Sequence, residues 1–368
     1  YVAATTGAST RFALPTVTVH PAADTVEGAI AAALNVTQFS LQYAVQSGNA
    51  AQISQLAAAV GSLLNSQEAS FQPGTVAFNA AVSVRNELLG AIGSAVSIGD
   101  STSMSSIVQQ LNALNMVTYY PNQLSASSVN LAATALSGAV VAANSGNIVL
   151  PPDAIKAALH TASSALSAAA TVSTTFSSQA VANAFQLVRS IDGVLTSQLS
   201  GLACGQDGVE EVVGGVLNTF VNKPLLSAVR GADITAGPNA VFTLPMDLFG
   251  ARPAAACVGL QTTVIQQSAN PYAYTGDQIR SDLASLAFSN ADGSPLPVVA
   301  LIHPINITLQ ISSLPSDGMV GTLPSPRLPP SHEGITRIDS RLRLLFLARC
   351  AASCRYWNGS GWGVDGCM

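Results

Sequence analysis

The chain has 368 residues, of which 48% are hydrophobic and only 9% are charged, and its formal net charge is −5. This apolar content can bury the core of one large or two ordinary domains and argues against overall disorder. Two lysines and twelve arginines give no broad basic surface, which excludes nucleic acid as an expected partner. The low charge favours an extracellular protein over a cytosolic enzyme, because solubility must come from hydroxyl and amide groups.

Residues 1–23 are interpreted as a linker or the end of a preceding domain. The chain begins with Tyr1 and shows no signal peptide, so we interpret it as a fragment. The stretch at 342–352, LRLLFLARCAA, is too short and too rich in arginine to cross a membrane, and no apolar run reaches about 18 residues. The sequence therefore predicts no membrane span within this chain.

Residues 24–224 have helical periodicity, and about seven or eight helices fit this region. At 47–66 the apolar residues follow helical spacing, Asn49 is a candidate N-cap, and Gln52 stands in the capping-box position. Another helix is predicted over 151–170, with prolines in its first turn. One stripe of that helix carries Ile155, Leu159, Ala162 and Leu166.

Two more helices are predicted at the end of this region. The first has an apolar stripe made by Val181, Phe185, Val188, Ile191, Leu195 and Leu199. The second is predicted to begin at Asp207 and Glu210 and to bury Val209, Val212, Val213, Val216 and Phe220. The facing residues are mostly Ala, Gly and Ser, which bury little apolar area, so we expect the helices to depend on packing against the next subdomain.

After Pro224 the period changes from helix to strand. Two segments alternate apolar and polar residues, and their apolar positions are Val258, Leu260, Thr262, Val264 and Ile305, Ile307, Leu309, Ile311. Turn sequences at 236–240, 268–277 and 290–295 separate the strands. The fold class expected is therefore α+β, with a helical subdomain at 24–224 followed by an antiparallel β-sandwich of half-buried strands at 225–368.

Residues 314–349 match neither pattern. Six of the twelve arginines lie between Arg327 and Arg355, among prolines. One interpretation is a solvated loop or linker. The other is a stretch foreign to the native domain, such as an unspliced intron, because the composition changes abruptly.

The five cysteines all lie in the second half of the chain, at 204, 257, 350, 354 and 367. A zinc site would need four ligands at short paired spacings, and only Cys350 and Cys354 are close in sequence, so disulfides are favoured over metal. We predict that Cys204 pairs with Cys257 and joins the helical part to the sandwich. The alternative is that both are buried free thiols.

The sequence contains no recognisable catalytic motif, and we expect no cofactor, no metal and no catalytic residue. Asp247 and Asp292 lie in turn sequences, where acids usually cap or are solvated. Glu210 and Glu211 are explained by the start of the predicted helix. His160 is interpreted as a helix residue and not as a ligand.

Three N-glycosylation sequons occur, at Asn35, Asn306 and Asn358, which is no more than chance predicts for this composition. Asn306 is the favoured acceptor because the strand alternation turns its side chain away from the apolar face. Asn35 remains a second candidate, whereas Asn358 lies between the tryptophans and is not favoured.

Both tryptophans of the chain lie near its carboxyl end, in CRYWNGSGWGVDGCM. The spacing of Cys354, Trp357, Trp362, Gly366 and Cys367 resembles the first half of the GPS motif, which ends the GAIN domain of adhesion receptors and polycystin-family proteins. The segment 41–66 is similar, with less specificity, to the helix pair of polycystin-like and REJ-type sequences. In the family, a helical subdomain precedes a β-sandwich whose last strands are the GPS motif. The resemblance implies that the tryptophans anchor the closing strands and that Cys354 and Cys367 tie them down.

The chain departs from the family at the cleavage site. Cleaving members continue through two more cysteines to a His-Leu-Ser or His-Leu-Thr tripeptide, and no histidine of this chain precedes such a pair. Self-cleavage is therefore not expected, and the partners of Cys354 and Cys367 stay open.

The resemblance implies a non-enzymatic module on the extracellular side of a plasma or ciliary membrane, or a secreted one. Its partners would be an extracellular ligand or adhesion partner and a membrane region further along the same gene product. One alternative is a structural protein of an extracellular coat or ciliary surface, favoured by the charge-poor composition. A weaker one is a self-cleaving precursor, if the full gene supplies the tripeptide.

Overall fold

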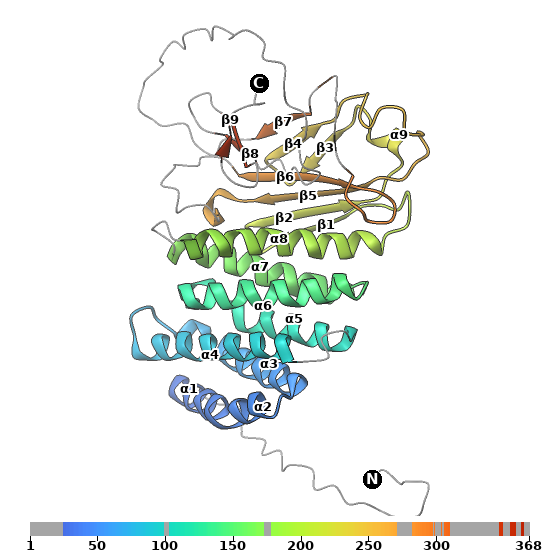
Figure 1. The fold of residues 1–368 in the computed structure, drawn as a ribbon. Helices are drawn as coiled ribbons and strands as arrows, with labels where there is room; N and C mark the ends of the chain where they lie inside the picture. Colours follow the sequence, from blue (N-terminus) through green and yellow to red (C-terminus); the bar gives the residue numbers. More distant parts are fainter. Residues whose placement is uncertain are drawn as a thin grey trace, which may run out of the picture.

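The computed structural model describes residues 25–98, 103–172, 178–270, 282–296, 298, 303, 305–309, 346–348, 354–357 and 362–363. The fold is α+β, as the sequence predicts: eight helices in the amino-terminal half are followed by two antiparallel sheets. Figure 1 shows the helices as a stack of layers, with α1 and α2 at one end and the sheets on the other. The predicted linker 1–23 lies outside the described residues.

The helices are mostly long and regular. Their bounds are α1 Val26–Asn35, the π-helical turn η1 Val36–Leu41, α2 Gln42–Gln46, α3 Ala50–Ser66, α4 Val76–Ile98, α5 Met104–Thr118, α6 Ala126–Ser145, α7 Pro152–Val172 and α8 Ser178–Ser200. Side-chain caps set several of the starts: Thr25, Ser103 and Ser125 each accept a backbone N–H three residues on. Asn49 does the same for Gln52 N at 3.0 Å, which confirms the predicted cap.

The helices stack in two columns. One column runs α3, α5, α7 and the other runs α4, α6, α8, and each helix packs against the next member of its column and against its sequence neighbour. Such an array is quasi-one-dimensional, since each layer touches only the layers beside it. The predicted stripe of α7 is buried throughout, whereas in α8 Phe185 is half exposed and lies outside the stripe that buries Val188, Ile191, Leu195 and Leu199.

Close contacts between layers occur at glycines. A Cβ at Gly61 of α3 would stand 3.0 Å from the carbonyl carbon of Met116 in α5. A Cβ at Gly138 of α6 would collide with the side chain of Val96 in α4, and a Cβ at Gly193 of α8 would collide with the side chain of Val140 in α6. The Ala- and Gly-rich composition is therefore explained by the short distance between layers.

The strands form two sheets. The larger has the order β1 Val209–Val213, β2 Leu217–Asn222, β5 Gly259–Ile265, β6 Leu283–Ser289, β8 Phe346–Ala348, β9 Cys354–Trp357 and β10 Trp362–Gly363; the smaller has β3 Asp233–Ala236, β4 Ala240–Thr243 and β7 Asn306–Leu309. Every described pair is antiparallel. The short helix α9, Leu226–Val229, lies between β2 and β3.

The helix predicted from Asp207 to Phe220 is wrong. These residues form the β1–β2 hairpin, which turns at Gly214 and Gly215 with φ of +57° and +68°. β-branched residues fit the pleated sheet well, and the hairpin places Val213, Leu217 and Val221 in the core shared with the helices. The helical part therefore ends between Ser200 and Val209, and not at residue 224.

The prediction of half-buried strands holds for β7 and fails for β5. Along β7 exposed and partly buried residues alternate, whereas all seven residues of β5 are buried. One face of β5 packs on α8, where Gln261 Nε2 donates to Thr196 Oγ1 at 3.3 Å, and the other carries Leu260 and Val264 into the core between the sheets. The large sheet is thus the middle layer of the molecule.

The predicted turns are partly confirmed. Residues 236–240 connect β3 and β4, with Gly237 at φ +63°, and 290–295 form the turn after β6. In that turn Asp292 accepts hydrogen bonds from Ser294 Oγ at 2.6 Å and Ser294 N at 2.9 Å, and these bonds lower the pKa of its carboxyl. Most of 268–277 and of the arginine-rich stretch 314–349 lies outside the described residues, but the end of that stretch, Phe346–Ala348, is strand β8 and not loop.

Candidate functional site

Three of the residues that resemble a GPS motif, Cys354, Trp357 and Trp362, lie at one edge of the large sheet. Cys354 opens β9, opposite Ala348 of β8, and Trp357 and Trp362 are register partners in the β9–β10 pair. β8 in turn joins the sheet through the pair Ala284↔Phe346 with β6. The two tryptophans therefore share one cross-strand position on neighbouring strands, while Gly366, Cys367 and Cys350 lie outside the described residues.

The predicted pairing of Cys204 with Cys257 is confirmed as a disulfide with Cα atoms 5.9 Å apart. Cys204 follows α8. Cys257 precedes β5 and forms an isolated antiparallel β-bridge with Leu225. Backbone hydrogen bonds hold both sides, since Gly205 N donates to Lys223 O at 2.8 Å and Val258 N to Pro224 O at 3.0 Å. The disulfide thus anchors the connection that leaves the helical stack to the start of the central strand.

Helix α7 contacts strand β1 through polar groups. Ser163 Oγ donates to Val213 O at 3.1 Å, and Lys156 Nζ lies 3.8 Å from Glu211 Oε1. Glu210 and Glu211 are therefore strand residues and not the helix start that was predicted. His160 lies on α7, half-buried, and burial lowers its pKa, although the nearby Glu211 carboxylate acts in the opposite direction.

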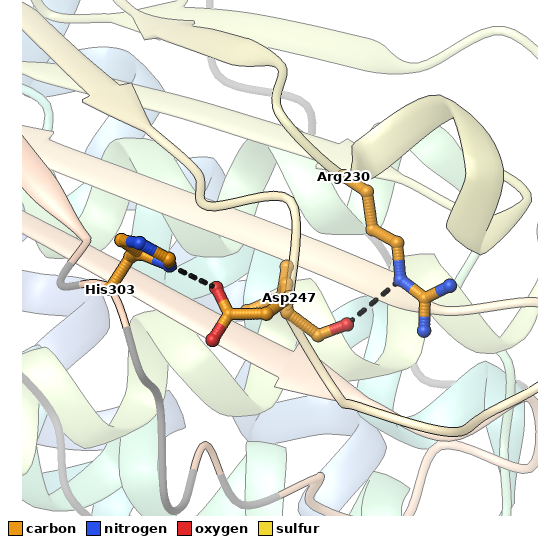
Figure 2. Close-up of polar contacts among 4 residues, drawn as sticks. Arg230, Asp247 and His303 are labelled. Atoms are coloured by element: carbon orange, nitrogen blue, oxygen red, sulfur yellow. Dashed lines mark hydrogen bonds and ion pairs between the residues drawn. The ribbon is translucent and has the colours of Figure 1, made fainter.

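The structure brings together Asp247 and His303, which lie 56 residues apart in sequence. His303 Nδ1 is 3.4 Å from Asp247 Oδ1, and the side chain of His303 is 72% exposed. Figure 2 shows His303 and Arg230 on either side of the turn that carries Asp247. An acid–histidine pair orients a base for a nucleophile, but in the described residues no hydroxyl or thiol is recorded within hydrogen-bond reach of this imidazole.

Arg230 explains the shape of the same loop. Its guanidinium donates to three main-chain carbonyls, those of Leu248 at 3.0 Å, Gly250 at 2.5 Å and Arg252 at 3.2 Å. The loop also holds Phe249 at φ +60°, a conformation that is unusual for a residue with a side chain. The loop is therefore stabilised by Arg230, and His303, from the segment before β7, contacts Asp247 at the surface of this turn.

The favoured sequons differ in their surroundings. Asn306 and Thr308 are both exposed on β7, as the alternation predicts. Asn35 is exposed at the end of α1, but Thr37 is buried and donates its hydroxyl proton to Leu34 O at 3.0 Å. Both asparagines remain candidate acceptors, and Asn358 lies outside the described residues.

The sequence reading missed Arg85, which is fully buried in α4. Its guanidinium donates to Gln123 Oε1 at 2.9 Å, Val117 O at 2.7 Å and Asn65 Oδ1 at 2.7 Å. The signal was present, because Arg85 stands at helical spacing from the buried Ala81, Leu88 and Ile92. An arginine at such a position indicates either that buried polar groups bind its guanidinium or that this side of the helix is not buried.

Among the described residues, no group of three or more His, Cys, Asp or Glu side chains could hold a metal ion. Helix α6 is long and apolar enough to span a membrane, but half of that window is buried, and it packs between α4 and α8.

No family model matches the chain, and no curated protein is significantly similar to it.

Proposed function

We propose that the chain is a non-enzymatic, extracellular GAIN-like module of a polycystin-like or related receptor. In this function it relays binding or adhesion at its amino-terminal side to a membrane region that follows in the same gene product. The observation that carries the proposal is the order of the layers, in which a helical stack is followed by a sandwich whose large sheet ends in the strands with the Cys354, Trp357 and Trp362 spacing.

A relay requires that the two ends move together. The core of the helical stack continues into the large sheet, since it includes Val213, Leu217, Val221, Ile265 and Leu283 beside the helical residues. Gly259 of β5 also allows the side chain of Leu199 in α8 to approach the strand closely. Close packing transmits displacement between layers, because tightly packed interiors have low compressibility.

The disulfide supports the extracellular part of the proposal. Disulfides persist in oxidising compartments and are rare in the cytosol. Cys204 and Cys257 are 53 residues apart in sequence, so a bond between them also constrains the unfolded chain strongly.

The transcript beyond Met368 provides the test. The proposal expects a continuation with two cysteines, a His-Leu-Ser or His-Leu-Thr tripeptide, and then an apolar run of about twenty residues. A stop codon directly after Met368 in the complete transcript would contradict it. Sequencing across 314–349 in the same experiment decides whether that stretch is native.

The non-enzymatic part has its own test. An acyl shift needs a nucleophile beside the scissile bond and a base within reach, and the family's tripeptide for this is absent from the sequence. The purified chain is expected to remain one polypeptide during prolonged incubation at neutral pH, as measured by mass spectrometry. A discrete break between Cys354 and Met368 without added protease would contradict this.

A second candidate is a structural protein of an extracellular coat or ciliary surface. The favouring observation is the scarcity of charge, since only 9% of residues are charged. Assembly of such chains would be salt-insensitive. The stop codon that contradicts the receptor proposal is the result that this candidate expects.

A further inference from the structure

A groove lies on the flank of the helical stack. It is lined by Glu68 of the short helix η2 (Glu68–Ser70), Tyr120, Pro121 and Asn122 in and before η3 (Pro121–Gln123), and Ser167 and Thr171 of α7. Its volume is about 610 Å³, which lies within the range of about 300–1,000 Å³ that is typical of small-molecule sites. Three segments distant in sequence thus form one concave surface.

Tyr120 forms the aromatic wall of the groove, and Arg85 and Tyr119 contact its ring. The guanidinium carbon of Arg85 lies 5.9 Å from the centroid of the Tyr120 ring, and Tyr119 contacts that ring edge-on at 5.1 Å. Arg85 is itself immobilised by its hydrogen bonds to Gln123, Val117 and Asn65. Tyr120 is therefore pre-organised, which lowers the entropic cost of binding a ligand against it.

The polar wall of the groove is rich in acceptors. Ser167 Oγ donates its proton to Ser163 O at 3.0 Å and Thr171 Oγ1 donates to Ala168 O at 2.8 Å, so both hydroxyl oxygens offer only lone pairs to a ligand. The Glu68 carboxylate adds two more acceptors, and the Asn122 amide offers one acceptor and two donors. A matching ligand carries several hydrogen-bond donors together with an apolar face.

We propose that this groove binds a neutral sugar unit of a glycan. Sugar hydroxyls supply the donors, and the C–H face of the ring packs on an aromatic side chain. The Glu68 carboxylate lines the groove and selects against an anionic ligand. This inference does not depend on the receptor proposal, since a coat protein could use the same groove.

Saturation-transfer NMR with the purified full chain tests the proposal. The probes are methyl glycosides of galactose, mannose and N-acetylglucosamine, with N-acetylneuraminic acid as the anionic comparison. We expect saturation transfer to at least one neutral glycoside, and none to the anionic sugar. Failure of all three neutral probes, or equal transfer to the anionic one, overturns the inference.

Variants locate the binding. Tyr120→Ala is expected to weaken binding about tenfold by removing the aromatic wall, and Glu68→Gln about fivefold by replacing a charged acceptor with a neutral one. The matched control is Tyr43→Ala, which removes a tyrosine 67% exposed on α2, outside the groove, and binding should not change. Thermal melting of each variant confirms folding, and if Tyr120→Ala does not fold, Glu68→Gln alone decides. Unchanged binding in the folded groove variants, or equal loss in the control, overturns the inference.

Discussion

Arg85 is a buried cation whose neighbours are amides, carbonyls and an aromatic ring. Burial lowers its pKa to about 10, against weaker opposing effects from Tyr120 and Glu68, so the guanidinium is still charged at neutral pH. Its partners come from three segments: Asn65 at the end of α3, Val117 in α5 and Gln123 in the following turn. One side chain therefore connects three segments of neighbouring layers.

Arg85→Ala is expected to lower the free energy of unfolding by about 3–4 kcal/mol, because several buried acceptors lose their donor and a cavity forms. The substitution also removes a desolvated charge, which is stabilising, but the destabilisation from the unpaired acceptors is larger. Urea denaturation measures the change. The control is Arg189→Ala on the exposed side of α8, which should stay within about 0.5 kcal/mol of the parent. Equal effects of the two substitutions would show that the network stabilises nothing.

His160 predicts a pH dependence. Burial lowers its pKa in the folded state, despite the attraction of Glu211. As the pH falls below the unfolded value of about 6.5, the unfolded chain binds the proton more readily than the folded one, so stability is lost until the folded pKa is passed. Above about pH 7.5 the imidazole is almost fully neutral in both states, so the residue contributes little pH dependence there.

His160→Gln should therefore reduce the loss of stability between about pH 7.5 and pH 5. Denaturant titrations of the parent and the variant at both pH values measure this difference. Equal losses in the two proteins would mean that the histidine is not the group responsible.

At the scale of elements, glycine positions decide how closely helices pack. A Cβ at Gly61 meets the main chain of Met116, which cannot move aside without displacing α5, whereas a Cβ at Gly90 of α4 has no atom within 4 Å in the described part of the chain. Gly61→Ala is expected to cost about 1–3 kcal/mol by overpacking. Gly90→Ala should stabilise by about 0.5–1 kcal/mol through helix propensity. Thermal or urea unfolding of both variants tests the pair, and equal signs would contradict the close-contact argument.

The β1–β2 hairpin shows where local patterns are ambiguous. Valines at 209, 212, 213 and 216 satisfy helical spacing, yet the first three lie in strand β1 and Val216 lies in the turn before β2. The Gly214–Gly215 pair was the available signal, because two successive positive φ values end any helix. The strand conformation is favoured because it lets Val213, Leu217 and Val221 pack against α7 and α8, which cover this face of the large sheet.

At the scale of the whole molecule, the disulfide constrains the route from the helices to the sheets. In the chain-entropy model, closing a loop across 53 residues is worth about 4 kcal/mol. The double variant Cys204→Ser/Cys257→Ser is therefore expected to lose about 2–4 kcal/mol of unfolding free energy.

Urea unfolding under oxidising conditions measures this loss, and Ser200→Ala, at the exposed end of α8, is the control that should have little effect. Non-reducing peptide mapping should find the two cysteines linked. Recovery of both in alkylated form would contradict the pairing.

The sequence by itself determined the local features. The α+β order, the helix starts at caps such as Asn49, the half-buried strand β7 and the turn at Asp292 all follow from contacts within a few residues, which a period or a cap reports directly. The Cys204–Cys257 pair was predicted because both lie near the inferred boundary.

The tertiary structure decided everything that depends on which layer covers which face. β5 is buried on both faces, because α8 packs on one face and the small sheet packs on the other. The alternation of apolar and polar residues along the strand could predict only one buried face. Arg85 is acceptable in a core because Asn65 and Gln123 reach it from other segments, and Asp247 meets His303 across 56 residues. Such contacts depend on the relative placement of whole layers, and no local period encodes that placement.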